Sequence, residues 1–130
     1  MRYTNRRILV VVVMQVVRIA REMVSLHESY ADRIIDLAEE STRTGAPIVR
    51  PVWWSADRAD EPALTVDDQF MLGDDVLVAP VVEHGATERD VYVPRGRWMD
   101  QLRTTVVEGG RWYRAYPAAL DELPRFVRVQ

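Results

Sequence analysis

Apolar side chains recur at three- and four-residue steps from Val16 to about Thr42, which predicts an amphipathic α-helix. Gly45 suits the position just after a helix, and Pro47 blocks its continuation. The pattern allows one long helix or two helices with a break near Ser25. The apolar stripe consists of Val16, Ala20, Met23, His27, Tyr30, Ile34 and Leu37, widened by Ile19, Val24, Ile35 and Ala38.

The N-terminal segment combines arginines with an apolar run over residues 8–14. This order is similar to the start of a signal peptide, but Gln15 and Arg18 follow without a small-residue cleavage site. The run is also far shorter than the roughly 20 apolar residues of a membrane-spanning helix. The pattern favours a buried strand or the first turns of a helix.

Short apolar runs dominate the rest of the chain and predict β-strands. Residues 48–54 form the first run, after a Gly-Ala-Pro turn, and residues 55–66 read as a polar loop. Further strands are predicted at residues 76–82, 89–93, 96–100 and 126–129, with residues 104–107 and 111–116 forming a hairpin around Gly109-Gly110. This spacing is typical of an antiparallel sandwich or barrel piece and places a domain boundary near residues 64–70.

Length and composition exclude several classes of protein and of binding site. The 130 residues are 48% apolar and 28% charged, which is typical of a globular chain. They are too few for a closed (β/α)₈ barrel of about 250 residues. Cysteine is absent, which excludes disulfides and thiolate metal sites. All 17 basic residues are arginine, yet the net charge of −3 argues against a large nucleic-acid-binding surface.

Few residues are arranged for catalysis. The acid pairs at residues 67–68 and 74–75 flank a short apolar turn, and neighbours in sequence point apart, so we interpret them as turn-capping residues. His27 lies on the helical stripe as a core or interface residue, and His84 lies in an exposed glycine turn. We therefore expect no metal site. Neither a nucleophile elbow nor a phosphate-binding loop is present, and no cofactor is expected.

The four tryptophans are the remaining candidates for ligand contact. Aromatic faces stack on sugar rings, although burial is the commoner use of tryptophan. Trp53 and Trp54 close the predicted strand at 48–54 and should point to opposite sides of it, so at most one lines any one pocket. Trp98 and Trp112 lie on later β segments. For each of the four, we favour a place in the core.

Several ordered motifs resemble glycoside hydrolase family 31, which includes α-glucosidases, α-xylosidases and the myogenesis-regulating glycosidase group. The most specific are Asp67-Asp68-Gln69-Phe70 and Leu77-Val78-Ala79-Pro80-Val81. The resemblance covers about residues 14–129, and its other motifs lie at residues 30–40, 44–54, 85–100 and 120–128. Residues 1–13 depart from the family pattern and form an unmatched leader.

The resemblance implies an α+β fragment. Residues 14–66 would be the C-terminal end of a (β/α)₈ barrel, with its last helix–strand unit, and residues 67–130 the proximal antiparallel β-sandwich domain. The family hydrolyses α-glycosides with retention, using two aspartates that lie upstream of every matched residue. No catalytic residue is therefore expected here, and the chain alone should be inactive.

Trp53 and Trp54, at the end of the barrel strand, are the expected substrate-binding residues. The expected partners are an α-glycoside and the missing barrel portion, with neither nucleic acid nor a membrane. Two other functions stay open. The chain could be a non-catalytic carbohydrate-binding module with sugar contacts at Trp53 or Trp98, or an interaction module that completes another chain's barrel.

Overall fold

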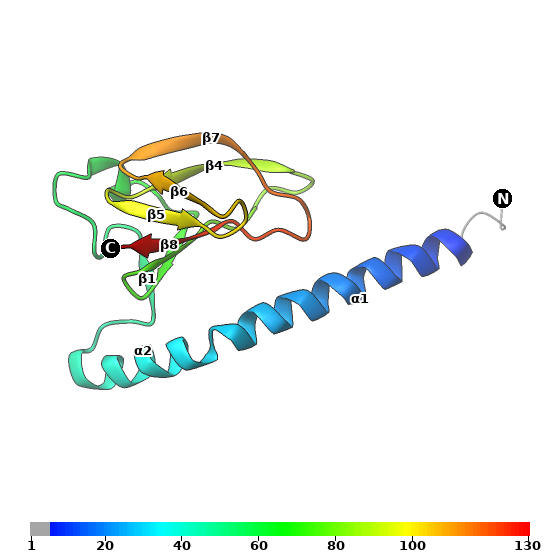
Figure 1. Ribbon diagram of the computed structural model, residues 1–130, viewed down its shortest axis with the longest axis horizontal. Coiled ribbons are helices and arrows are strands. Elements are labelled where there is room, and N and C mark those ends of the chain that lie inside the picture. The colour runs from blue at the N-terminus through cyan, green and yellow to red at the C-terminus, as the bar shows by residue number, and fades with distance from the viewer. Residues whose placement is uncertain (1–5) are drawn as a thin grey trace. The chain divides into compact units, whose positions relative to one another are not determined.

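The computed structural model describes residues 6–130, and it begins with two consecutive helices (Figure 1). Helix α1 spans Arg6–Ser29 and helix α2 spans Ala31–Thr44. They are separated at Tyr30, whose N–H donates to the carbonyl of His27, three residues back, at 3.1 Å. The apolar run over residues 8–14 forms the first turns of α1. The two-helix alternative is therefore confirmed, with the break later than Ser25.

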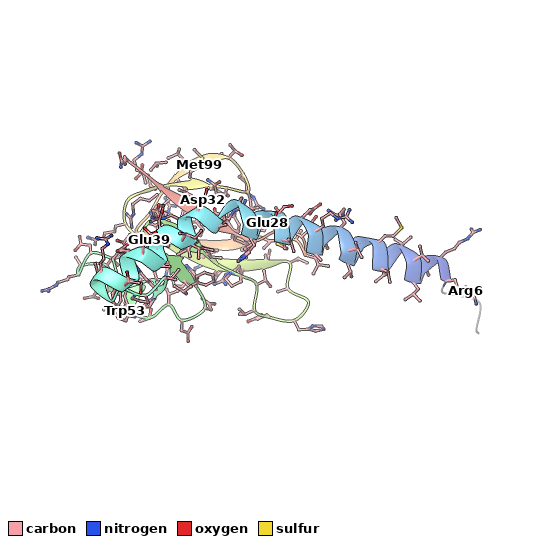
Figure 2. The ribbon with its side chains drawn as sticks, turned by 90° about the horizontal axis from the view of Figure 1, so that it is seen from below. Arg6, Glu28, Asp32, Glu39, Trp53 and Met99 are labelled. Carbon is pink, nitrogen blue, oxygen red and sulfur yellow. The ribbon has the colours of Figure 1, made fainter. Side chains whose placement is uncertain are left out.

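The chain divides into two compact units between Thr44 and Gly45. In the described part of the helical unit, Leu37 is the only buried residue, and α1 has none. Polar side chains such as Glu28, Asp32 and Glu39 are exposed, and Figure 2 labels them. Neither described helix combines the length and the apolarity that crossing a membrane requires. Exposed apolar side chains of this unit include Ile8, Leu9, Val10, Val11, Val12, Val13, Met14, Val16, Val17, Val24 and Ile35.

The second unit is an antiparallel β-sandwich. One sheet has six strands in the order β1-β2-β3-β8-β5-β6, and the other pairs β4 with β7 (Figure 1). Every strand pair is antiparallel, which confirms the predicted sheet type. The strands are β1 (Val49–Pro51), β2 (Phe70–Leu72), β3 (Val76–Val78), β4 (Glu88–Val93), β5 (Arg97–Asp100), β6 (Thr105–Glu108), β7 (Arg111–Pro117) and β8 (Arg125–Val129), with a 3₁₀ helix η1 (Glu61–Leu64).

The first strand belongs to the same sheet as the strands that follow it. Val49 pairs with Leu72, and Pro51 with Phe70, so β1 lies at an edge of the six-stranded sheet. This pairing explains why the compact unit begins at Gly45 rather than near residues 64–70. The assignment of residues 45–66 to a barrel stays a prediction.

The predicted hairpin between residues 104–107 and 111–116 is wrong. Strand β6 pairs with β5, and β7 pairs with β4. The four strands form one long ribbon that bends from one sheet into the other at Pro94–Gly96 and Gly109–Gly110. The N–H groups of Gly109 and Gly110 donate to the carbonyls of Gly96 and Val93 at 2.7 Å and hold this corner together.

The core lies between the two sheets and draws side chains from both. Its largest fully buried residues include Trp98 and Phe126 from the six-stranded sheet and Tyr92 from β4. The Trp98 indole N–H donates to the carbonyl of Pro94 at 2.8 Å, which satisfies its one polar atom. The core placement of Trp98 is therefore confirmed, and this residue has no surface to offer a sugar.

Candidate functional site

Trp53 and Trp54 lie in an exposed turn after β1. The strand ends at Pro51, and the N–H of Trp54 donates to its carbonyl at 3.0 Å, which begins the turn. The side chains are 47% and 44% exposed, and their ring centroids lie 6.0 Å apart with the planes tilted by 36°. The expectation that they point to opposite sides is wrong, because neither residue is in a strand. They form a tilted aromatic pair at the surface (Figure 2, where Trp53 is labelled).

The loop that carries this aromatic pair is attached to the sandwich by buried residues. Val52 packs in the core beside the pair, and Ala63 does so further along the loop. The Asp60 carboxylate is buried, with one oxygen accepting the Tyr92 hydroxyl and the other the Arg95 N–H at 3.1 Å. These contacts give the exposed tryptophans a fixed support.

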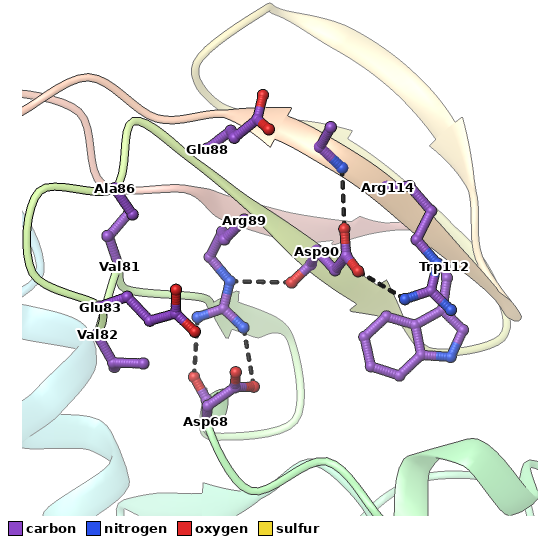
Figure 3. A pocket seen from close by; sticks show the side chains of 11 residues that line it. Asp68, Val81, Val82, Glu83, Ala86, Glu88, Arg89, Asp90, Trp112 and Arg114 are labelled. Carbon is purple, nitrogen blue, oxygen red and sulfur yellow. Dashed lines mark hydrogen bonds and ion pairs between the residues drawn. The ribbon is translucent and has the colours of Figure 1, made fainter.

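A second candidate is a pocket of about 470 Å³ beside β4 and β7 (Figure 3). An indole, two guanidinium groups and several carboxylates surround it. Its lining residues are Asp68, Val81, Val82, Glu83, Ala86, Glu88, Arg89, Asp90, Trp112, Arg114 and Ala115.

The pocket owes its shape to an irregularity in the β4–β7 pair. The pairing shifts between Arg89 and Val91, so that Asp90 on β4 faces two bulged residues on β7, Arg114 and Ala115. Its carboxylate accepts the N–H of Ala115 at 2.9 Å and the Arg114 guanidinium at 2.6 Å. The backbone hydrogen bond from Ala115 and the bond from Arg114 hold the pKa of Asp90 below its ordinary value. Asp90 therefore presents a fixed anion to the pocket.

Arg89 lines the pocket and links three segments of the chain. Its guanidinium forms an ion pair with Asp68 at 2.8 Å and donates to the carbonyls of Asp68 and Pro80. Its Nε donates to the carbonyl of Asp90 at 3.0 Å. The side chain is only 8% exposed, so we assign it a structural role.

The acid pairs noted in the sequence also make structural contacts. Asp68 pairs with Arg89, and Asp74 pairs with the buried Arg50 at 2.6 Å. The segment between them, predicted as an apolar turn, is strand β2 followed by a turn at Gly73. His84 is exposed as expected, whereas His27 is exposed rather than in a core. Within residues 6–130, no group of three or more histidine, aspartate or glutamate side chains could hold a metal ion.

Sequence reasoning missed the pocket residues Asp90 and Arg114. They lie 24 positions apart and are brought together by the bulge and by Ala115, whose φ is +49°. No spacing rule connects them. Trp112 was noted, but only as a core residue; it is half-buried and packs against Tyr92 with ring centroids 5.3 Å apart.

Comparisons with known proteins place the chain in a family. Residues 45–130 match the Glycosyl hydrolase family 31 C-terminal domain. That range is the whole of the β-rich unit. The chain therefore belongs to glycosyl hydrolase family 31, as its motifs indicated.

Individual relatives agree with this assignment. The chain is 44% identical over 113 residues to the myogenesis-regulating glycosidase of Mus musculus, covering 86% of this chain and 16% of that protein. It is 38% identical over 116 residues to the SITS-binding protein of Tetronarce californica, covering 87% of this chain and 16% of that protein. It thus spans about a sixth of the length of these relatives.

A solved structure shows the same fold. The GH31 dextranase of Flavobacterium johnsoniae, in complex with isomaltotriose, superposes with a TM-score of 0.80 at 34% identity, covering 85% of this chain and 14% of the dextranase. The match supports the antiparallel β architecture described above. The described residues, 6–130, do not include the closed barrel of the family.

Proposed function

We propose that this chain is the C-terminal portion of a glycosidase that hydrolyses α-glycosides, and that the 130-residue polypeptide has no hydrolytic activity by itself. The match of residues 45–130 to the family's C-terminal domain carries the proposal. The chain corresponds to about a sixth of its relatives, which leaves most of a glycosidase outside it.

The roles of its acidic residues support the absence of catalysis. Retaining hydrolysis requires two carboxyl groups about 5–5.5 Å apart, one nucleophile and one acid/base. The two most buried aspartates, Asp60 and Asp100, each bind a tyrosine hydroxyl in the core. Asp68 and Asp74 are held in ion pairs with arginines. None of these four groups is placed to attack a glycosidic carbon.

In this proposal, Trp53 and Trp54 contact the carbohydrate. Two exposed rings 6.0 Å apart offer an apolar surface, and the carbon-bound hydrogens of a sugar ring pack well on such surfaces. The buried contacts of Val52 and Asp60 keep that surface in place.

The exposed apolar side chains of the helical unit are consistent with a partner that supplies the remaining barrel. Val16, Val24 and Ile35 belong to the predicted apolar stripe, yet each is more than half exposed. In this proposal, the helical segment over residues 14–44, which includes most of α1 and all of α2, belongs to the last helix–strand unit of the barrel, and its stripe packs against barrel strands from outside this chain. Burial of this apolar surface would supply the driving force for association with that partner.

The proposal is tested by incubating the purified 130-residue chain with aryl α-glucosides and aryl α-xylosides and following release of the phenol. No release above the uncatalysed rate is expected. Hydrolysis that disappears when one of its aspartates is changed to asparagine would refute the proposal.

An alternative function is a non-catalytic carbohydrate-binding module, which the exposed Trp53–Trp54 pair favours. Maltose or xylose would then change tryptophan fluorescence, and Trp53→Phe with Trp54→Phe would remove the change. The absence of a fluorescence response would eliminate this alternative.

A second alternative is an interaction module that completes the barrel of another chain. Light scattering tests it, because a chain that is monomeric in solution would contradict it.

A further inference from the structure

The pocket beside β4 and β7 has no part in the proposed function and shares no residue with the Trp53–Trp54 pair. Its volume of about 470 Å³ falls within the range of small-molecule sites. Figure 3 shows Asp90, Trp112 and Arg114 together on one side of it, with Glu83 on the other side and Glu88 above. The pocket therefore combines one aromatic wall with several hydrogen-bonding groups.

The hydrogen-bonding capacity of this pocket is only partly used. A carboxylate can accept about four hydrogen bonds, and that of Asp90 accepts those from Ala115 and Arg114. The Arg114 guanidinium has five N–H donors, and it contacts Asp90 through Nη1. The Arg114 side chain is 67% exposed, which leaves it accessible to a ligand. A ligand with neighbouring hydroxyl groups could donate to Asp90 and accept from Arg114 at the same time.

The charges of the lining disfavour an anionic ligand. Arg89 and Arg114 are each paired with an aspartate, Asp68 and Asp90 respectively. The exposed Glu83 and Glu88 remain, and they give the pocket an excess of negative charge. A phosphate or a sugar acid would be repelled, whereas hydroxyl groups could donate to these carboxylates.

A cationic ligand is disfavoured by the position of Arg114. Its guanidinium carbon lies 4.8 Å from the centre of the Trp112 ring, over the face where a ligand cation would bind. The indole still lines the pocket and contributes apolar surface to it, as do Val81, Val82 and Ala86. This surface suits the carbon-bound hydrogens of a sugar ring.

The backbone at this pocket is strained. Ala115 has a φ of +49°, a left-handed conformation that is unfavourable for a residue with a Cβ. The Asp90 carboxylate holds its N–H in place, and Ala115 itself belongs to the β4–β7 bulge. Such strain and such bulges occur preferentially at functional sites.

From these observations we infer that the β4–β7 pocket is a second, non-catalytic carbohydrate site that binds a neutral oligosaccharide. Asp90 and Arg114 bind adjacent hydroxyl groups, Glu83 and Glu88 accept further hydroxyls, and Trp112 packs against the ring. The site does not depend on hydrolysis by this chain or on the Trp53–Trp54 surface.

The test uses the full chain labelled with ¹⁵N. Its four tryptophans give four indole N–H signals, and each is assigned by a single Trp→Phe variant. Maltotriose and isomaltotriose are titrated at millimolar concentrations, with inorganic phosphate and spermidine as charged probes. We expect the Trp112 signal to shift with at least one trisaccharide and with neither charged probe. The signal of the buried Trp98 reports that the fold is intact.

Variants decide whether the shift arises in the pocket. Arg114→Ala and Glu88→Gln should each weaken trisaccharide binding, the first by about ten-fold or more, because hydrogen bonds to a charged group are lost. Arg97→Ala is the matched control, because Arg97 is an exposed strand arginine, paired with Glu108 at 3.6 Å, outside the lining. Its binding should equal that of the unchanged chain.

Each other outcome overturns the inference. These outcomes are a static Trp112 signal, a shift produced by phosphate or spermidine instead, and equal affinity in Arg114→Ala. If only the Trp53 and Trp54 signals move, the proposed sugar contact stands and this second site fails. If only Trp112 moves, the second site stands and the proposed contact at Trp53 and Trp54 fails.

Discussion

The Tyr92 hydroxyl on β4 donates a hydrogen bond to the carboxylate of Asp60, which precedes it by 32 positions. Both residues are buried. Nearby, the Gln69 side chain binds the N–H and the carbonyl of Tyr92 at 2.8 and 2.7 Å, as a neighbouring strand would. Two side chains thus fasten the segment between β1 and β2 to the opposite sheet.

Replacing Asp60 by alanine should lower the free energy of unfolding by about 2–4 kcal/mol, because the Tyr92 hydroxyl and the Arg95 N–H both lose their acceptor. Urea denaturation measures the loss. Glu61→Ala is the matched control at the adjacent exposed acid, with an expected change within about 0.5 kcal/mol. Equal effects of the two substitutions would contradict the role assigned to Asp60.

Stability should fall in alkaline solution because of two buried tyrosines. Burial, and then the carboxylates of Asp60 and Asp100, raise the pKa of Tyr92 and Tyr116 above the ordinary value of 10.0. Unfolding returns each pKa to its ordinary value. The stabilising contribution is therefore complete below pH 10.0 and is lost as the pH rises above it.

Above that pH, the free energy of unfolding should decrease by about 1.4 kcal/mol per pH unit for each of the two tyrosines. Urea denaturation from about pH 9 to pH 11 measures this slope, and Tyr92→Phe should make it shallower. The same slope in Tyr92→Phe and in the unchanged chain would rule out the assignment for that residue.

Asp90 should make a contribution to stability that is lost in acid rather than in alkaline solution. Its pKa is held below the ordinary value of 3.8 by the Ala115 N–H and by Arg114. The stabilisation from Asp90 is therefore present above pH 3.8 and is lost as the pH falls through the lower, folded-state pKa. Asp90→Asn should lower the thermal midpoint at pH 7, and the difference should shrink at about pH 2. A difference that persists in acid would contradict this assignment.

Two glycines should differ in their tolerance of alanine. A Cβ on Gly109 would lie 1.7 Å from the carbonyl oxygen of Pro94, so the two turns at the corner would have to separate. Gly109→Ala should cost more than about 3 kcal/mol. Gly85 has a φ of +75° and open space around it, so Gly85→Ala should cost about 1–2 kcal/mol. Urea denaturation of both variants compares them, and a larger loss at Gly85 would disprove the close approach at the corner.

The sequence predicted the helices well because their periodicity is a local property. The apolar stripe from Val16 is present in α1 and α2, but no glycine or proline marks the break at Tyr30. The break shows as a change of hydrogen bonding, with Tyr30 bound to His27. A change of that kind leaves little trace in the pattern of side chains.

Strand partners were harder to predict than strands. The Gly109-Gly110 pair carries a strong local turn signal, yet it forms a corner rather than the end of a hairpin. The true end lies after Asp100, whose carboxylate accepts the N–H groups of Leu102 and Arg103. Choosing between the two turns requires knowing which strands lie beside β4 and β5, and that depends on the whole sandwich.

At the candidate sites too, the sequence predicts the residue types, whereas the fold decides which of them are exposed or in contact. Their tryptophans were recognised by type, but the burial of Trp98 follows from its place on β5, between β8 and β6. Trp53 and Trp54 are exposed because β1 stops at Pro51. The contact between Asp90 and Arg114 depends on a bulge, and the spacing of residues in the sequence does not predict that bulge.

The bent ribbon from Glu88 to Pro117 has a consequence for folding. Its tip at residues 101–104 closes the shortest loop within the ribbon, so strand pairing can begin there at a small entropic cost and extend residue by residue along β5 and β6. Pairing then continues past the bend and joins β4 to β7. The smaller sheet is therefore expected to form only after the tip has closed, and the two layers should assemble as one kinetic event.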